Sequence, residues 1–277
     1  MQNLPRIVRL GVPALIVALI GGFAVYKLFI EVEAPDEVTT DSALEQLAED
    51  LAADDGTDGA AEATDESGSD AAVADQVDDD VAPDDGALAF EGVVGTWAVD
   101  DEFGDFTFDT ASGSFAGFRV EKSLFTGQGV TAVGRTGGVT GTVTIGDGVL
   151  TGAEITVDMT SIVSDESGRE GAIRDAVRAS DFPTATFVAA DTVAFDTGAL
   201  EAGETVSVTV AGEMTIAGET NTVEVAIEAT VPEDGVGLVV GSTELVWADF
   251  GVETPTSMAG TVADNGIVEF QLVVRPS

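Results

Sequence analysis

Three arginines fall within one short segment of an otherwise acidic chain. The segment SGREGAIRDAVRAS at 167–180 holds three of only ten Lys and Arg, against 51 Asp and Glu. Ser167 followed by Glu170 has the spacing of a capping box, so the segment is predicted to be a helix. Arg174 and Arg178 continue a four-residue spacing that begins with acids, which suits i,i+4 pairing and the helix dipole. A structural role therefore explains these two arginines.

Arg169 is placed differently on the predicted helix. At 100° per residue, the apolar face of the helix is formed by Ala172, Ile173, Ala176 and Val177, and Arg169 lies on that same face. A charged group directed toward an apolar surface needs a partner. Two interpretations follow: Arg169 makes a salt bridge or reaches solvent where the helix meets the domain, or it meets the polar end of a molecule held inside.

Several kinds of chemistry are excluded because the chain contains no Cys and no His. Thiolate nucleophiles, Cys/His zinc sites, imidazole acid–base catalysis and His-ligated haem all need them. Carboxylates are abundant, but no spacing singles out a catalytic pair or a nucleophile with its base. A net charge of −41 argues against nucleic-acid binding, which requires Lys and Arg to neutralise phosphates. We therefore expect no enzyme, no metal site and no cofactor.

Composition divides the chain into three regions. Residues 1–30 contain no acid and a nearly continuous apolar run, residues 31–89 contain 21 acids and no base, and residues 90–277 contain 30 acids, 7 bases and both Trp. Only the third region has the apolar content to bury a sizeable core. We assign these regions as a membrane anchor, a linker and a folded domain.

The anchor is predicted at residues 10–30, which carry one charge, Lys27, near the end of the segment. At 1.5 Å per residue this segment spans roughly 30 Å, about one hydrocarbon core. Arg6 and Arg9 precede it and acids follow it. The positive-inside rule then predicts a single-pass membrane protein with a cytoplasmic N-terminus and everything after residue 30 outside. The alternative is a signal peptide cleaved near residues 22–24, which would give a secreted protein.

The acidic linker at 31–89 lacks the apolar residues to offset the entropy of ordering, and we expect it to be disordered. Within it, EVTTDSALEQLAEDLAADD at 37–55 is expected to form no more than a transient helix. As a flexible coil, the linker would average about 40 to 45 Å from end to end and hold the domain clear of the bilayer.

The sequence of the folded domain predicts strands with one apolar face. In TVSVTVAGEMTI at 205–216 apolar and polar residues alternate, and after the turn AGET the segment at 222–231 alternates again, as in a β-hairpin. About eight to ten such strands indicate an all-β antiparallel sandwich or closed barrel, and long sequential hairpins favour the barrel. An eight-stranded barrel is either just filled by side chains or holds one small ligand. Similar strands are expected at 139–145, 154–160 and 267–274.

The domain resembles the YceI-like family, lipocalin-like proteins known as polyisoprenoid-binding, over about residues 95–275. The resemblance lies in the order and spacing of several pieces, none of them specific alone. These pieces are TWAVD, GSFAGFRVEKSL, VGRTGGVTGTVTI, ITVDMTSIVSDESGREGAIRDAV, FPTATF, VAGEMTIAGETNTVEV and ADFGVETP. The resemblance implies an antiparallel barrel of about eight strands, a helix near its mouth and an elongated apolar cavity for an isoprenoid chain.

Two departures from the family pattern bear on the site. The family's Arg-Asp pair before its Phe-Pro element matches Arg169-Glu170 by spacing or Arg174-Asp175 by identity, and the helical-face argument favours Arg169. In MTIAGET, Ala217 stands where a His is frequent in relatives, so any ligand contact made by that His is absent here.

The leading hypothesis is a membrane-tethered extracytoplasmic protein that holds a polyprenyl lipid or quinone. The competing hypothesis is a packed, ligand-free barrel that serves as a surface interaction module. A homodimer is compatible with both. The resemblance and the inward parity of the strands give a candidate lining, which consists of Phe118, Val120, Val157, Met159, Arg169, Ile173, Val177, Phe187, Met214, Ile216 and Trp247.

Overall fold

The structure is a computed structural model that describes most of the predicted domain and part of the linker. The predicted membrane segment at 10–30 lies outside the described residues, and the helices within those residues are too short or too polar to cross a bilayer. The described residues are 34–54, 92–104, 106–108, 112–124, 126–164, 168–233, 235–254, 256–257 and 260–277.

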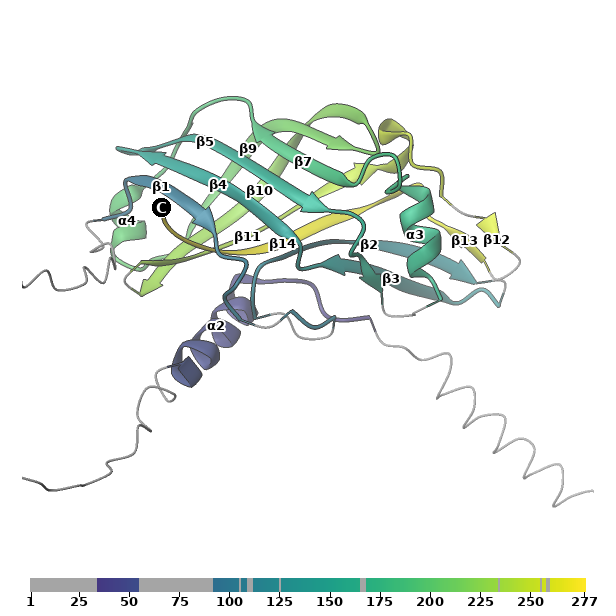
Figure 1. Cartoon of the computed structure of the whole chain (residues 1–277), viewed down its shortest axis with the longest axis horizontal. Helices are drawn as coiled ribbons and strands as arrows, with labels where there is room; N and C mark the ends of the chain where they lie inside the picture. Colours follow the sequence, from purple (N-terminus) through teal and green to yellow (C-terminus); the bar gives the residue numbers. More distant parts are fainter. Residues whose placement is uncertain are drawn as a thin grey trace, which may run out of the picture.

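Eight antiparallel strands form a closed barrel (Figure 1), which confirms the predicted fold class. The ring closes because β1 pairs with β4 on one side and with β14 on the other. Closure removes the exposed strand edges that an open sheet would present. In ring order the strands are β1 (Gly95–Val99), β4 (Val139–Gly146), β5 (Val149–Asp158), β7 (Thr184–Ala189), β9 (Val206–Ile216), β10 (Glu219–Glu233), β11 (Val236–Val246) and β14 (Asn265–Pro276).

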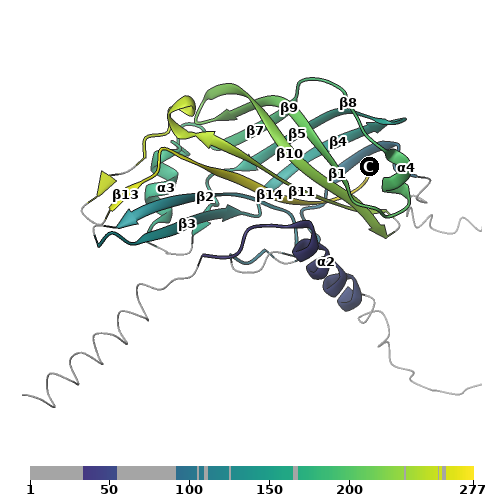
Figure 2. The ribbon, with the colours of Figure 1, turned by 180° about the vertical axis from the view of Figure 1, so that it is seen from behind.

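The long strand β14 changes partners along its length. Its last residues pair with β1, while residues 267–271 pair with β2 (Phe115–Leu124). Beyond β2 lie β3 (Gly129–Thr136) and the two-residue β6 (Val163–Ser164). The same end of the barrel carries helix α3 (Glu170–Ala176) and the short strands β12 (Thr256–Ser257) and β13 (Gly260–Val262), and we call it the mouth (Figure 2).

The opposite end is closed by packed side chains. Strand β8 (Val193–Ala194) and helix α4 (Thr197–Glu201) lie there, and Leu200 of α4 packs with Trp97 and Val139. The indole Nε1 of Trp97 donates a hydrogen bond of 2.9 Å to the carbonyl of Val93. With its polar atom satisfied, the ring contributes apolar surface to this closed end.

The predicted hairpin between β9 and β10 is confirmed. Its strands pair in register from Ile216 with Glu219 to Val206 with Ala229, and buried residues alternate with exposed ones along β9. The two-residue turn is made by Ala217 and Gly218, with φ of 50° and 83°. Positive φ at both turn positions matches the right-handed twist of the flanking strands.

The expectation of disorder throughout the linker is wrong for residues 40–54. Thr40–Asp54 forms helix α2, which packs against the outside of the barrel (Figure 1). Ala43 and Leu47 are only 1% exposed, because they contact Leu238 of β11 and Val273 of β14. These outward residues of β11 and β14 are themselves fully buried, so where α2 covers them both strands are buried on two faces rather than one.

A buried ion pair lies beside α2 on the same outer face. The Glu269 carboxylate lies 2.7 Å from Nη2 of Arg135, with both side chains 4% exposed, and 3.6 Å from Nη1 of Arg119. Both arginines also donate hydrogen bonds to the carbonyl of Asp36, at 3.0 and 3.1 Å. The guanidinium of Arg135 lies 4.8 Å from the ring centre of Phe115. Strands β2, β3 and β14 are thereby joined to the segment that precedes α2.

We expect Glu269→Gln to lower the free energy of unfolding by about 3 kcal/mol, because it leaves buried Arg135 without a compensating charge. Denaturant unfolding of the chain from residue 34 onward measures this change. Glu224→Gln, which alters an exposed carboxylate on β10, is the matched control and should change little. Equal midpoints for the two variants would contradict the structural role assigned to the ion pair.

Candidate functional site

A cavity of about 490 Å³ lies inside the barrel. On β14 its lining extends from Leu272 to Val268. Val268 pairs with Phe118 of the neighbouring strand β2, and along β2 the lining continues to Lys122. Eight residue steps at about 3.3 Å each give a length of about 26 Å. The cavity is therefore elongated along the barrel and runs from the closed end to the mouth.

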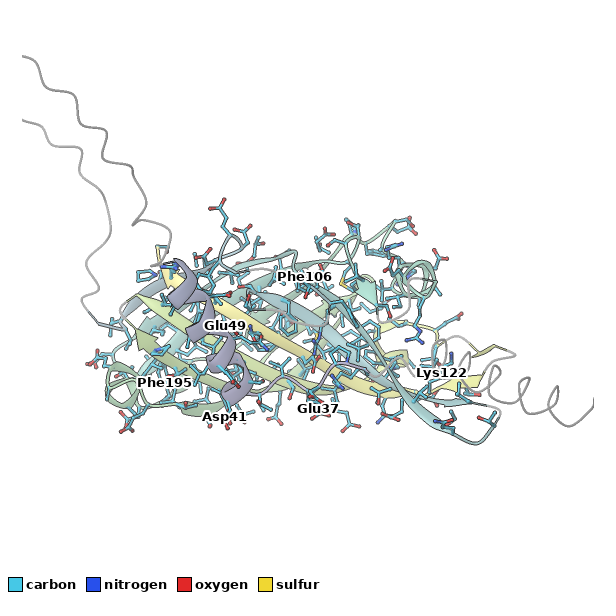
Figure 3. All side chains as sticks on the ribbon, turned by 90° about the horizontal axis from the view of Figure 1, so that it is seen from below. Glu37, Asp41, Glu49, Phe106, Lys122 and Phe195 are labelled. Atoms are coloured by element: carbon cyan, nitrogen blue, oxygen red, sulfur yellow. The ribbon has the colours of Figure 1, made fainter. Side chains whose placement is uncertain are left out.

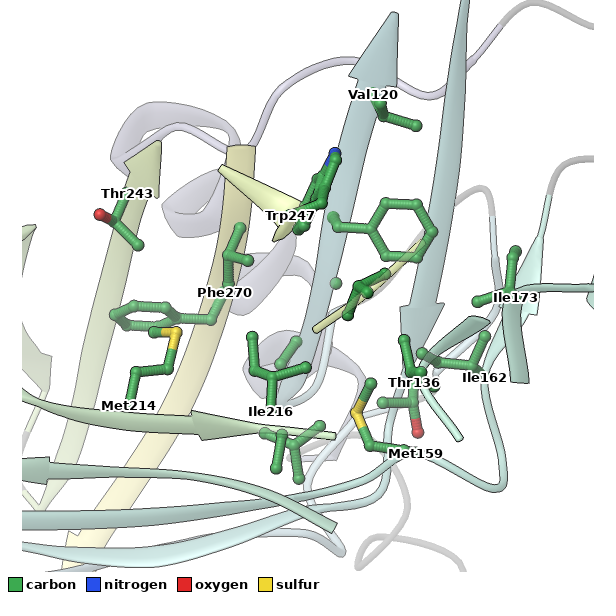
Figure 4. A pocket seen from close by; sticks show the side chains of 18 of the residues that line it. Val120, Thr136, Met159, Ile162, Ile173, Met214, Ile216, Thr243, Trp247 and Phe270 are labelled. Carbon is green, nitrogen blue, oxygen red and sulfur yellow. The ribbon is translucent and has the colours of Figure 1, made fainter. Parts of the chain in front are cut away.

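The walls of the cavity are predominantly apolar. Figure 4 shows Ile173 of α3 and Met159, Met214, Ile216 and Trp247 from the barrel around one space. The ring of Trp247 meets that of Phe118 edge-on, with centroids 6.0 Å apart and planes at 78°. This geometry is favourable for aromatic pairs and fixes both rings at the wall.

Glycines on neighbouring strands keep the aromatic rings out of the lumen. Each ring takes the place that a side chain on the glycine would need, so a Cβ there would lie within 2.5 Å of a ring atom. The rings can then lie against the wall instead of filling the interior. The pairs and the Cβ-to-ring distances are Phe118 with Gly134 (2.5 Å), Phe187 with Gly212 (2.4 Å), Phe270 with Gly241 (2.4 Å) and Trp247 with Gly266 (2.3 Å).

Polar groups are concentrated at the mouth. Lys122, Arg169, Glu253 and Thr254 line the cavity there, on β2, beside α3 and after the η2 turn (Trp247–Phe250). Deeper in the lumen, the hydroxyl of Thr136 is within hydrogen-bonding distance of Ser161, at 2.7 Å. Such a site suits an amphiphile whose apolar chain fills the lumen and whose polar end stays at the entrance.

The predicted helical face is confirmed, but the predicted start of the helix is wrong. Helix α3 begins at Glu170, with Arg169 at the N-cap position and no side-chain cap. Ser167, the expected cap, lies outside the described residues. The face is positioned as expected, because the cavity lining includes Arg169, Ala172, Ile173, Ala176 and Val177.

Arg174 and Arg178 tie the α3 segment to the barrel, as a structural role requires. Arg174 Nη1 donates a 3.1 Å hydrogen bond to the carbonyl of Ile162. Arg178 lies beyond the helix end with φ 53°, donates to the carbonyl of Ala217 and stacks 4.8 Å from the ring centre of Phe182. Both contacts are with groups of the barrel rim or its adjoining loop, and they hold α3 over the mouth.

A carboxylate stabilises the turn that presents Met159 to the cavity. The Thr160 hydroxyl donates a 2.6 Å hydrogen bond to Asp158, and this bond, opposed by some burial, lowers the pKa of the Asp158 carboxyl. A lowered pKa means that the ionised form favours the folded state. This contribution is therefore present above the usual Asp pKa and is lost as the pH falls through the lowered value.

All eleven residues proposed from the sequence line the cavity. Residues that sequence reasoning missed fall into two groups. Some are small or polar, such as Ala116, Ala132, Thr136 and Thr243, and their side chains carry no apolar pattern. Others are large and apolar, such as Ile155, Val239, Val268, Phe270 and Leu272, and their inward parity within the strands is a usable signal. Within the described residues, no cluster of three or more acids could hold a metal ion.

We expect Gly134→Ala to reduce the cavity, because the three atoms nearest to the added Cβ all belong to the Phe118 ring, which must move toward the lumen. Binding of a fluorescent apolar probe such as anilinonaphthalene sulfonate, measured by titration, should weaken several-fold. Gly152→Ala is the control, since nothing lies within 4 Å of the added Cβ. Unchanged probe affinity in a folded Gly134→Ala protein would contradict this account of the cavity.

Comparison with solved structures finds similar chains at low sequence identity. A polyisoprenoid-binding domain from Saccharophagus degradans, implicated in plant cell wall breakdown, is 16% identical, with a TM-score of 0.47, covering 59% of this chain and 98% of that one. BcnA of Burkholderia cenocepacia is 21% identical, with a TM-score of 0.44, over 57% of this chain and 95% of its own. The YCEI protein of Campylobacter jejuni is 14% identical, with a TM-score of 0.39, over 50% and 81% of the two chains.

The search of curated proteins returned no match. The model of the YceI-like domain, in contrast, matches residues 106–274, which is more than half of the chain. This match covers the barrel from the approach to β2 to Val274 of β14 and includes α3 and the whole cavity lining. The chain therefore belongs to the YceI-like family.

Proposed function

We propose that this protein binds a polyisoprenoid or isoprenoid-quinone lipid, with the apolar chain in the lumen and the polar end at the mouth. The observation that carries the proposal is the elongated, predominantly apolar cavity of about 490 Å³ with its charged groups at one end. A volume of this size lies within the range of ligand pockets in proteins. Membership of a family with known polyisoprenoid binders supports the same ligand class.

The energetics favour a ligand of several isoprene units. Burial of one CH₂ group contributes about 0.8 kcal/mol, so a five-carbon unit contributes about 4 kcal/mol. Association costs about 4 to 15 kcal/mol in lost motional freedom. One unit barely offsets the lowest cost, whereas four units offset the highest. Affinity should therefore rise with chain length until the lumen is full.

The polar end of the ligand is proposed to lie near Arg169. This residue lines the cavity beside the start of α3, and Lys122 lines it from β2. Head groups with several acceptor oxygens suit such donors, because hydrogen bonds to charged donors are stronger than neutral ones. The other ten candidate lining residues are proposed to contact the chain.

We further propose that the barrel acts beside a membrane, as an extracytoplasmic carrier or reservoir anchored by residues 10–30. The support is the apolar 21-residue segment, with two arginines before it and acids after it. A cleaved signal at the same place would give a secreted carrier with the same ligand. In both cases the ligand is one that the bilayer supplies.

A filled barrel acting only as an interaction module is disfavoured. Such a barrel requires side chains to occupy the interior, whereas here four aromatic rings lie over glycines and leave the lumen open. A dry apolar cavity of this size would lose dispersion contacts along its whole lining if it had no ligand.

Native mass spectrometry of the chain from residue 34 onward, purified without detergent from a lipid-rich host, tests the proposal. We expect a mass adduct that is extractable into organic solvent and identifiable as an isoprenoid lipid. The double variant Ile173→Trp, Met214→Trp fills the lumen from two sides and should lose the adduct.

Val188→Trp is the matched control, because Val188 is exposed on β7 and the added ring points away from the lumen. An apo mass for the unaltered protein, unchanged after incubation with polyprenyl lipids and quinones, would contradict the proposed function.

A further inference from the structure

Residues 34–54, which we call the strap, form part of the folded domain rather than a spacer. They comprise an extended segment at 34–39 followed by α2. The extended segment is held where Arg119 and Arg135 donate to the carbonyl of Asp36, and α2 is held where Leu47 packs on the barrel. At the junction, the hydroxyl of Thr40 donates to the carboxylate of Glu228.

The strap runs in a defined direction along the barrel. Arg119 pairs with Ile267, near the start of β14, whereas Val273, which contacts α2, lies near its end. The start of β14 lies on the mouth side, because β2 continues from there to Lys122. The strap therefore begins on the mouth side and proceeds toward the closed end. Figure 3 shows Glu37 nearer to Lys122 than Asp41 and Glu49 of α2 are.

We propose that the strap holds the mouth of the barrel close to the bilayer and turned toward it. The proposal rests on the membrane anchor proposed above. Only six residue steps separate Ile30, at the end of the predicted span, from Asp36. A fully extended chain reaches at most about 3.6 Å per residue, so Asp36 lies within about 22 Å of the point where the chain leaves the membrane.

This reach is about half of what the whole linker would give as a flexible coil. Residues 55–91 connect the far end of α2 to the barrel, so they add nothing to the distance between the barrel and the membrane. From Arg119 to Lys122 at the mouth is three steps along β2, or about 10 Å. A lipid can then pass between bilayer and lumen without the barrel leaving the surface.

Two insertions of about ten Gly/Ser residues distinguish a docked strap from a flexible tether. One is placed after Glu33, between the span and the strap, and the other after Asp70, between α2 and β1. The full chain is placed in vesicles that carry acceptor lipids, and energy transfer from a donor dye on the protein to these lipids is measured. The dye is attached either to Thr126→Cys at the mouth or to Asp147→Cys at the closed end. Both positions are exposed, and the chain has no cysteine of its own.

We expect the Thr126 dye to transfer more energy to the bilayer than the Asp147 dye. The insertion after Glu33 should lower the Thr126 signal, whereas the insertion after Asp70 should leave it unchanged. Leu47→Asp places a charge in the buried contact of α2 and should release the strap, so that the difference between the dyes is lost and the two insertions become equivalent. Ala48→Asp adds the same charge on the exposed side of α2 and should leave the difference intact.

Flotation of the full chain with the vesicles is measured first, and lipid loading is followed in each variant. A chain that does not float overturns both the proposed anchor and this inference. A chain that floats and binds lipid, but shows equal transfer from the two dyes or equal effects of the two insertions, overturns the strap inference alone. If Leu47→Asp prevents lipid loading, the pair of insertions in the unaltered background still decides the question.

Discussion

Four aromatic side chains lie over glycines of neighbouring strands, and the open interior of the barrel depends on these contacts. An eight-stranded barrel is just wide enough for its own side chains to fill, so an open lumen requires that the largest of them be held at the wall. Gly134, Gly212, Gly241 and Gly266 provide that space where a larger residue would displace a ring. The same arrangement lets Phe118 and Trp247 pack on each other instead of across the lumen.

Most of the arginines among the described residues serve as internal hydrogen-bond donors. Arg119 and Arg135 hold Glu269 and the carbonyl of Asp36, while Arg174 and Arg178 bind carbonyls around the mouth. Charged donors form stronger hydrogen bonds than neutral ones. When the acceptor is a backbone carbonyl, no second charged group has to be buried with the arginine. Four arginines thus fix the strap on the outer face of the barrel and α3 at its mouth.

Much of the barrel and its lining could be predicted from the sequence, because alternate residues along a strand lie on the same face of the sheet. The β9–β10 hairpin and the inward Met214 and Ile216 follow directly from alternation. The strap could not be predicted in this way. Ala43 and Leu47 make a weak apolar pair in an acidic segment, and the surface that they cover belongs to strands nearly 200 residues later in the chain.

The start of α3 and the role of the glycines also could not be predicted from the local sequence. Ser167 and Glu170 have the spacing of a capping box, yet the helix begins at Glu170 with Arg169 at its N-cap position. A glycine under a ring is recognised only when the pairing register is known, because Phe118 and Gly134 are adjacent across strands and not along the chain.

Methionine methyl NMR can establish whether an isoprenoid chain occupies the lumen. Met159 and Met214 both line the cavity, and the whole chain has only four methionines. With ¹³C-methyl methionine and a polyprenyl lipid of several units, we expect shifts of these two methyl resonances and nuclear Overhauser contacts from them to isoprene protons. Unshifted resonances without such contacts at saturating lipid would contradict binding in the lumen.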